Sequence, residues 1–304
     1  MQIKLERREE IDDKRWNGCV HFALGSPPYA YTWYLDNVCE DWMGLVVGNY
    51  KIVMPIVLGK KFGIHYNYQP FFTQQLGIYS DLPISKETST QFFNAIPSWV
   101  KYIDMSLNES NFAPEIGQSA ERINYLLDLK PTYSELREQY SGNVLRKVKK
   151  ATKEELVINK QISPEAFADF YRKHTGPKVK GFKDKHYYSI LRIVYKAIHY
   201  NMGFIIGVNN QQNELIAANF IISHPQRLIN LLPASSASGN KSGAMAFLID
   251  HLIQTNSGQY KYLDFEGSMI KGVANFYKGF GAKKTSYYHI KLNLLPKFLR
   301  ILKR

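Results

Sequence analysis

The sequence predicts an α/β (α+β) protein in which helices flank a mixed sheet, arranged in two domains. Short apolar stretches alternate with amphipathic helical stretches along the chain, and its 304 residues suffice for two modest domains. The charge also changes along the chain. Residues 1–130 carry 12 Lys/Arg and 15 Asp/Glu (net −3), whereas residues 131–304 carry 27 and 11 (net +16). We therefore expect one domain over residues 1–130 and a second, anion-binding domain over residues 131–304.

The first half contains the elements of a mixed domain. After a break at Pro27-Pro28 we expect a helix, then two strands joined by the turn signal Gly48-Asn49. A further helix and a strand follow before Lys130-Pro131 closes the half. The expected ranges are 29–42 for the first helix, 43–47 and 50–58 for the two strands, 86–96 for the second helix and 123–129 for the third strand.

The second half begins with helical stretches and continues as a meander of strands. Ser163 and Pro164 form a helix start, with Ser163 as the N-cap. The expected helices cover 132–140, 143–153, 182–200, 242–255 and 271–277. The expected strands cover 156–159, 203–208, 214–223, 227–233, 260–265 and 285–292.

The composition of the sequence argues against a secreted, a membrane-spanning or a metal-binding protein. The charged amino terminus resembles no secretory signal, and no apolar run is long enough to span a bilayer. The two cysteines lack metal-binding spacing and are expected to be buried thiols, which fits a reducing cytoplasm. The histidines show no HxH or HxxxH pairing, so a metal site is not expected. No tightly bound cofactor is expected either.

Residues 262–282 gather charge, aromatic rings and glycines at a predicted strand end. The strand ends in two carboxylates, Asp264 and Glu266, and the short helix that follows ends at Tyr277-Lys278. Ligands of α/β sheets bind at such places. Asp264 can accept a proton from an amine, or it can cap a turn or pair with a lysine. Lys278 can stabilise a phosphate or a developing oxyanion, or it can satisfy carbonyls at the helix end.

A small-residue loop over 234–241 leads from a strand into a helix. Its N–H groups and the positive end of the helix dipole suit a phosphate, although the spacing is not that of a Walker loop because Asn240 precedes Lys241. A plain solvated loop is the alternative. The candidate donor-binding residues of this stretch are Ser238, Gly239, Lys241, Ser242 and Gly243.

Two further basic segments stand out. In the predicted helix 143–153, Arg146, Lys149 and Lys150 share one face with Lys153. The C-terminal residues 292–304 combine an apolar stripe with basic residues, which is typical of contact with an anionic membrane surface or of docking on the protein's own domain.

The order of elements in the second half resembles an acyltransferase domain of the GNAT type. The stretches Asp264-Phe-Glu-Gly267 and Phe276-Tyr-Lys-Gly-Phe-Gly-Ala282 resemble the signature of the Fem-type (FemAB-like) transferases. The basic residues 143–151 are similar to a helix that opens the second domain of those proteins. The first half is similar to their degenerate first domain, so the resemblance implies two GNAT-like domains in tandem.

This resemblance implies transfer of an acyl or aminoacyl group to an amine acceptor. Lys278 matches a lysine near the reactive end of the donor, and Asp264 matches an acidic residue after the strand. The basic helix, with Arg146, Lys149 and Lys150, matches contacts to the phosphates of the donor. Tyr277 precedes Lys278 in the signature and is a further candidate donor-binding residue. The loop 238–244 keeps spaced glycines but departs from the acyl-CoA pattern. The co-substrate is therefore left open between acyl-CoA and aminoacyl-tRNA.

The alternative from another class is a non-catalytic GNAT-like module. Such a protein would bind nucleic acid or an anionic membrane through its basic C-terminal half. A pure binder has no need of Asp264 beside Lys278, and this pair therefore favours an N-acyltransferase.

Overall fold

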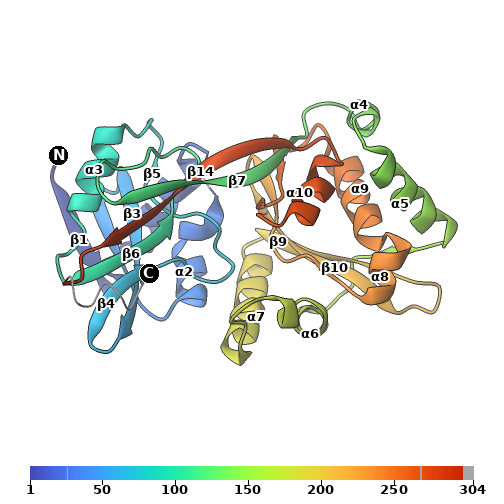
Figure 1. Ribbon diagram of the computed structural model, residues 1–304, viewed down its shortest axis with the longest axis horizontal. Coiled ribbons are helices and arrows are strands. Elements are labelled where there is room, and N and C mark those ends of the chain that lie inside the picture. Colours follow the sequence, from blue (N-terminus) through green and yellow to red (C-terminus); the bar gives the residue numbers. More distant parts are fainter. Residues whose placement is uncertain (26, 268, 297–304) are drawn as a thin grey trace. The chain divides into compact units, whose positions relative to one another are not determined.

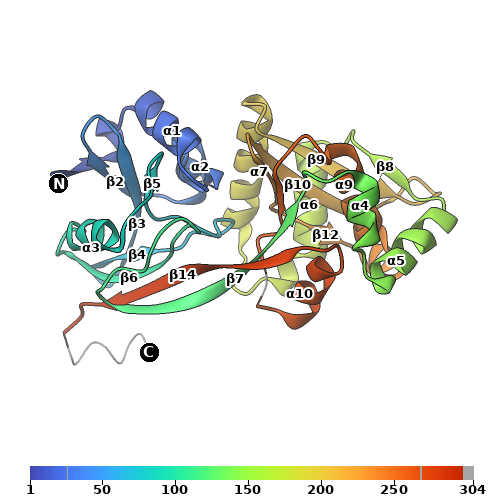
Figure 2. The same cartoon turned by 90° about the horizontal axis from the view of Figure 1, so that it is seen from above.

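The computed structural model describes residues 1–25, 27–267 and 269–296 (Figures 1 and 2). It divides into two compact units. The first unit contains Met1–Arg122 and the described residues from Ser286 onward, and the second contains Ile123–Thr285. Two strands, β7 (Gln118–Asp128) and β14 (Lys283–Asn293), each begin in one unit and end in the other.

The first unit contains short helices and a mixed sheet. Its helices are η1 (Arg8–Glu10), α1 (Asp13–Phe22), η2 (Pro28–Ala30), α2 (Thr32–Val38) and α3 (Lys86–Asn94). Its strands are β1 (Ile3–Arg7), β2 (Trp42–Val47), β3 (Ile52–Lys61), β4 (Ile64–Tyr68), β5 (Tyr79–Ser80) and β6 (Val100–Ser106), joined by the last part of β14. Helices α1 and α2 lie side by side in Figure 2.

The second unit contains the longer helices. These are α4 (Tyr133–Glu138), α5 (Gly142–Lys153), α6 (Pro164–His174), η3 (Gly176–Lys178), α7 (Asp184–His199), α8 (Ala237–Ser242), α9 (Ala244–Asn256) and α10 (Lys271–Lys278). Its strands are β8 (Val157–Asn159), β9 (Gly203–Asn209), β10 (Leu215–His224), β11 (Arg227–Asn230), β12 (Ala234–Ser235) and β13 (Tyr262–Asp264), joined by the last part of β7.

The two units repeat one strand topology. In the first, β1, β2, β3 and β4 pair antiparallel in turn, β6 joins β4 in parallel, and β14 joins β6 antiparallel. In the second, β8, β9, β10 and β11 pair antiparallel in turn, β13 joins β11 in parallel, and β7 joins β13 antiparallel. A crossover helix, α3 or α9, precedes each parallel strand, as a parallel connection requires. The last strand of each unit therefore comes from the other half of the chain.

This exchange changes the domain division expected from sequence. A boundary at residue 130 assigns 123–128 to the first domain and 286–293 to the second. In the structure β7 pairs with β13 through Leu126–Asp128, and β14 pairs with β6 through His289–Asn293. The strand pairing, which the local sequence does not encode, decides the membership of both segments.

The sheet of the second unit is covered on both faces. Helices α5 and α9 lie on one face and α6 and α7 on the other (Figure 1). The α5/α9 face forms a continuous core that includes Val148, Ile221, Leu252 and Leu263, each less than 9% exposed. On the other face Phe167 of α6 packs against Phe220 of β10. Burial of such side chains, at about 25 cal/mol per Å² of apolar surface, fixes the helices on the sheet.

Most predicted elements are present, and two differ. The helix expected over 29–42 is divided into η2 and α2, because Tyr31 and Cys39 are not helical and β2 begins at Trp42. The loop expected over 234–241 is the strand β12 followed by the helix α8. The Ser236 side chain caps α8 by accepting a hydrogen bond of 3.0 Å from the Gly239 N–H.

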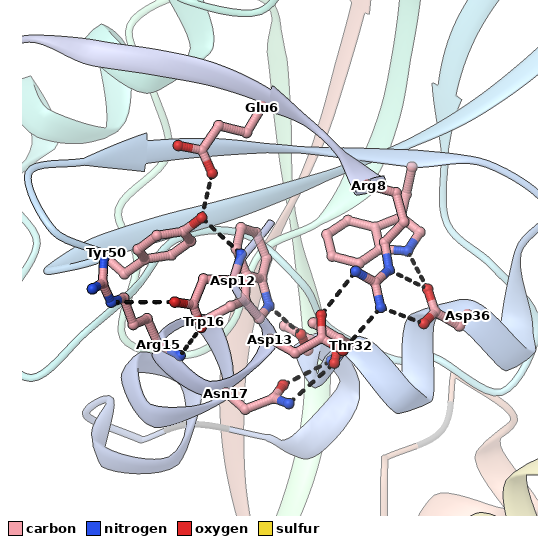
Figure 3. A network of polar contacts seen from close by, with 12 residues as sticks. Glu6, Arg8, Asp12, Asp13, Arg15, Trp16, Asn17, Thr32, Asp36 and Tyr50 are labelled. Carbon is pink, nitrogen blue, oxygen red and sulfur yellow. Dashed lines mark hydrogen bonds and ion pairs between the residues drawn. The ribbon is translucent and has the colours of Figure 1, made fainter. Parts of the chain in front are cut away.

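A polar network ties β1, α1 and α2 together in the first unit (Figure 3). The Arg8 guanidinium donates to both oxygens of Asp36, at 2.8 Å each, and to both oxygens of Asp13, at 2.8 and 3.1 Å. These carboxylates raise the pKa of Arg8 above its ordinary value. Tyr50 adds a second link, because its hydroxyl donates to Glu6 and accepts from the Asp12 N–H.

The predicted amphipathic C-terminal segment lies largely outside the described residues. Its first residues, Leu292 and Asn293, end β14, and residues 297–304 are not among those described. Within the described ranges, none of the helices has both the length and the apolar character that a membrane crossing needs.

Candidate active site

Two strands of the second unit part at their carboxyl ends. β11 and β13 pair in parallel only through Arg227–Ile229. Beyond Asn230 the chain bulges, because the N–H groups of Leu231 and Leu232 both donate to the Phe220 carbonyl, at 3.2 and 3.3 Å. The chain then continues as β12, paired with β10, while β13 ends at Asp264. The bulge thus opens the sheet between β12 and the end of β13, where ligands of α/β folds bind.

A pocket of about 300 Å³ lies beside β12. Its volume is within the range of small-molecule sites. Residues from β12, α5, α8, α9 and α10 line it, among them Lys147, Ser235, Gly239, Asn240, Met245 and Tyr277.

One backbone N–H is directed to this opening. The Ser236 N–H donates to the Ile216 carbonyl of β10 at 2.9 Å. Successive residues of a strand direct their N–H groups to opposite edges. The N–H of Ser235, which lines the pocket, therefore points away from β10 and toward the parted edge. A carbonyl oxygen in the pocket can accept a hydrogen bond there.

Tyr277 lines the same pocket and carries a buried hydroxyl. Its ring is 7% exposed and stacks on Phe265, with centroids 4.5 Å apart. The Asn230 side-chain amide, on β11, lies 3.5 Å from the hydroxyl as a hydrogen-bond donor. Burial, with the negative charge of Glu266 nearby, raises the pKa of Tyr277 above its ordinary value. The phenol is therefore protonated at neutral pH and can donate a hydrogen bond.

Asp264 is buried and bound on several sides. It is 1% exposed, and one carboxylate oxygen accepts from Arg227 of β11 at 2.8 Å. The other accepts from the Asn124 amide at 3.0 Å and from the Glu266 N–H at 2.8 Å. Of the two roles that the sequence allows, this environment favours the paired, turn-capping one. The partner is the arginine of a neighbouring strand, not a lysine.

Glu266 is the more accessible of the two carboxylates. It is partly exposed and has a left-handed backbone, with φ of 54°. Burial, with the negative charge of Glu266 as a second cause, raises the pKa of Tyr171, on α6, to about 12 and also raises that of Tyr277. Gly267 follows with φ of 51°, and a Cβ there would lie 2.2 Å from the Ile123 carbonyl oxygen. Only glycine fits that position, and this accounts for the glycine at the end of the Asp-Phe-Glu-Gly stretch.

Lys278 lies on another side of α10. Its side chain is exposed, and its amino group is 5.7 Å from the centre of the Tyr125 ring on β7. It is not among the residues that line the 300 Å³ pocket. Its catalytic role therefore stays a prediction.

The predicted basic face of α5 is present, and a neighbouring lysine is closer to the pocket. Arg146 and Lys149 are exposed, whereas Lys150 donates to the Lys241 carbonyl at 2.8 Å and so caps α8. Lys147 was not predicted. It lines the pocket, and its amino group lies 5.3 Å from the centre of the Phe276 ring. The helical pattern did not single out Lys147, because this residue lies between the exposed basic face of α5 and its buried apolar face.

The glycines of the predicted phosphate loop have packing roles. A Cβ at Gly239 would lie 2.1 Å from the Ile216 carbonyl oxygen, and one at Gly243 would lie 2.8 Å from the Lys147 carbonyl oxygen. Gly243 also has φ of 82°, which ends α8. The loop residues Ser238, Lys241 and Ser242 line a separate pocket of about 370 Å³. The sequence-predicted donor residues of this loop are therefore divided between two pockets, and the predicted Arg146, Lys149 and Lys150 line neither of them.

No three His, Cys, Asp or Glu residues come together as a metal site in ranges 1–25, 27–267 and 269–296.

No protein-family model matches this sequence, and no curated protein matches it. Several solved structures have a similar fold. FemX has a TM-score of 0.68 and 12% identity, with 100% of each chain covered. L-PGS from Bacillus licheniformis has a TM-score of 0.57 and 11% identity, covering 96% of this chain and 95% of that one.

A tandem GNAT protein from the clavulanic acid biosynthesis pathway has a TM-score of 0.53 and 8% identity, covering 97% of this chain and 100% of that one. The chain has a tandem GNAT-like fold. The repeated topology agrees with this, since each unit has one parallel strand pair within an otherwise antiparallel sheet. The expected fold class and the Fem-type resemblance are confirmed at the level of the fold.

Proposed function

We propose that this protein is an N-acyltransferase that transfers an acyl or aminoacyl group to an amine acceptor. The observation that carries the proposal is the 300 Å³ pocket beside β12, which Ser235 and Tyr277 both line. A carbonyl donor needs such hydrogen-bond donors where negative charge develops.

In this proposal the acceptor amine attacks the donor carbonyl, and the Ser235 N–H stabilises the resulting oxyanion. Glu266 does not itself line the pocket, but its charge acts on the pocket-lining Tyr277, and through a water molecule it takes the proton that the amine loses as the C–N bond forms. Tyr277 donates a hydrogen bond to the leaving sulfur or oxygen as its bond to the carbonyl carbon breaks. Asp264 holds the Glu266 backbone and does not itself take the proton. Positioning the two reactants side by side supplies much of the acceleration.

The donor in this proposal is an acyl-CoA or an aminoacyl-tRNA, and neither is tightly bound. Both carry a phosphate-bearing moiety, which the exposed Arg146 and Lys149 of α5 and the pocket-lining Lys147 can contact. The sequence-predicted role of Lys278 is charge stabilisation near the same reaction.

The test is binding followed by turnover. Thermal stability is measured with acetyl-CoA, longer acyl-CoAs and an aminoacyl-tRNA mixture; a ligand at a hundredfold excess over its Kd stabilises by about 2.7 kcal/mol. Transfer of a labelled acyl group to a panel of amines is then assayed with the donor that stabilises. Stabilisation without transfer to any amine would favour the non-catalytic binding module.

Variants then assign the donor contacts. Combined replacement of Arg146, Lys149 and Lys150 by Gln weakens donor binding if this face meets the donor's phosphates. Lys278→Ala cuts transfer strongly if the lysine stabilises charge, and unchanged turnover removes it from the mechanism.

A further inference from the structure

Helix α7 presents a basic and aromatic face that the proposed transfer reaction does not use. Its buried side packs on β9 and α6 through residues such as Ile190, Ile193 and Ala197. Its exposed side carries the outer stripe, which we define as Lys185, Tyr188, Arg192, Tyr195, Lys196 and His199. These positions follow the i, i+3, i+7 spacing of one helical face, so cations and rings alternate along the stripe.

The charge of this region is strongly one-sided. Residues 172–200 contain eight Lys/Arg and one acidic residue, Asp184, a net charge of +7. That single carboxylate already pairs with Arg172 at 2.7 Å. Glu165 and Asp169 of α6 also meet α7, through the hydroxyls of Tyr195 and Tyr187. The stripe itself carries three cations and no carboxylate, and this excess of positive charge suits an anionic partner.

The tyrosines of the stripe are exposed to an unusual extent. Tyr188 is 57% exposed and Tyr195 is 49% exposed, and Tyr200, just beyond the helix, is 47% exposed. Tyrosine rings combine an apolar body with a polar tip, which suits the headgroup region of a bilayer. Lysine and arginine stems lie along such a surface while their charged ends reach the phosphates.

We propose that the outer stripe of α7 docks the protein on an anionic bilayer surface. A bilayer is flat and can contact all of a helix about 24 Å long at once. A single-stranded nucleic acid fits the pattern less well, because its bases stack on rings that line a groove. The hydroxyl of Tyr195 is held by Glu165 of α6, so this ring cannot turn to follow a base. The proposal does not depend on acyl transfer.

The experiment measures binding of the full chain to vesicles by flotation. Vesicles of phosphatidylcholine with about 30% phosphatidylglycerol, an anionic lipid, are compared with vesicles of phosphatidylcholine alone. Each Lys or Arg near an anionic surface contributes about fivefold to binding. The triple variant Lys185→Gln/Arg192→Gln/Lys196→Gln is therefore expected to bind the anionic vesicles about a hundredfold more weakly.

The matched control is Arg146→Gln/Lys149→Gln/Lys153→Gln on α5, which removes the same charge from another exposed helix. Tyr188→Ala tests the aromatic part and is expected to weaken binding with the charge unchanged. Circular dichroism checks that each variant is folded.

The proposal is overturned if the two triple variants lose vesicle binding equally, because binding would then follow net charge. It is also overturned if the α7 variant binds anionic vesicles as the wild type does, or if the wild type binds neither kind of vesicle. Binding of a uridine 20-mer that the α7 variant loses, without vesicle binding by the wild type, would assign the stripe to nucleic acid instead.

Discussion

Replacement of Arg227 tests whether its buried ion pair with Asp264 stabilises the second unit. Arg227→Met keeps most of the apolar stem and removes the guanidinium. It leaves the Asp264 carboxylate buried, with hydrogen bonds from the Asn124 amide and the Glu266 N–H. The side chains of Arg227 and Asp264 are only 5% and 1% exposed, so water cannot replace the lost cation.

The expected loss is large for a single residue. Removing one partner of a buried ion pair costs about 3–5 kcal/mol, because the other charge is left uncompensated. The second unit spans Ile123–Thr285, which is 163 residues (285 − 123 + 1). For a domain of this size each kcal/mol shifts the midpoint by about 2–4 °C, so we expect Tm to fall by about 6–20 °C.

The assay is urea and thermal unfolding of Arg227→Met, Asp264→Asn and the double variant, followed by circular dichroism. Because both changes disrupt one pair, the double variant should lose less free energy of unfolding than the sum of the single variants. A loss below about 1 kcal/mol for Arg227→Met would refute the reasoning. So would an Asp264→Asn variant of unchanged stability and abolished transfer, since the carboxylate would then be a reactant.

Three further variants test other parts of the structure. Tyr277→Phe should lower kcat for transfer about 10- to 100-fold with little change in Tm, because one hydrogen bond to a charged leaving group is lost; unchanged kcat removes the hydroxyl from the reaction. Gly239→Ala should cost about 1–3 kcal/mol in urea unfolding, since its Cβ would meet the Ile216 carbonyl at 2.1 Å, whereas Gly142→Ala, with no atom within 4 Å of the new Cβ, should not destabilise. Asp104→Asn tests pH dependence. The hydrogen bond from His289 lowers the pKa of Asp104 in the folded protein. The contribution of Asp104 to stability is therefore present above its unfolded pKa near 4, and it is lost as pH falls through the lower folded pKa. The wild type should therefore exceed Asp104→Asn in Tm at pH 7 and match it at about pH 2; a constant difference would contradict this assignment.

Local patterns predicted most elements of the second unit. Ser163 is the N-cap of α6, accepting from the Ala166 N–H at 3.2 Å, and the basic spacing of α5 forms one exposed face. Such features depend on residues a few positions apart, which the sequence displays directly. The short helix that ends at Lys278 was predicted for the same reason.

What the sequence could not predict depends on distant partners. Arg227 and Asp264 are 37 positions apart, and only the parallel pairing of β11 with β13 brings them together. The exchange of β7 and β14 between the units has the same origin. The glycines at 239 and 243 resemble a phosphate loop in sequence, but their neighbours, the carbonyls of Ile216 and Lys147, come from other elements.

The two carboxylates of the Asp-Phe-Glu-Gly stretch have different environments in this structure, and one experiment tests whether they also have different roles. Glu266 has a left-handed backbone, which costs a non-glycine residue about 1–2 kcal/mol, and the Asp264 carboxylate holds it there through its N–H. Strain of this kind persists where surrounding contacts impose it, often at sites of function. Glu266→Gln should therefore lower kcat by about 10²–10⁴, the contribution of a general base, at nearly unchanged Tm. Asp264→Asn should mainly lower Tm, because the residue it replaces holds the buried Arg227 and the Glu266 backbone. If Glu266→Gln turns over as the wild type does, a different group receives the amine proton, and the roles of the two carboxylates must be reassigned.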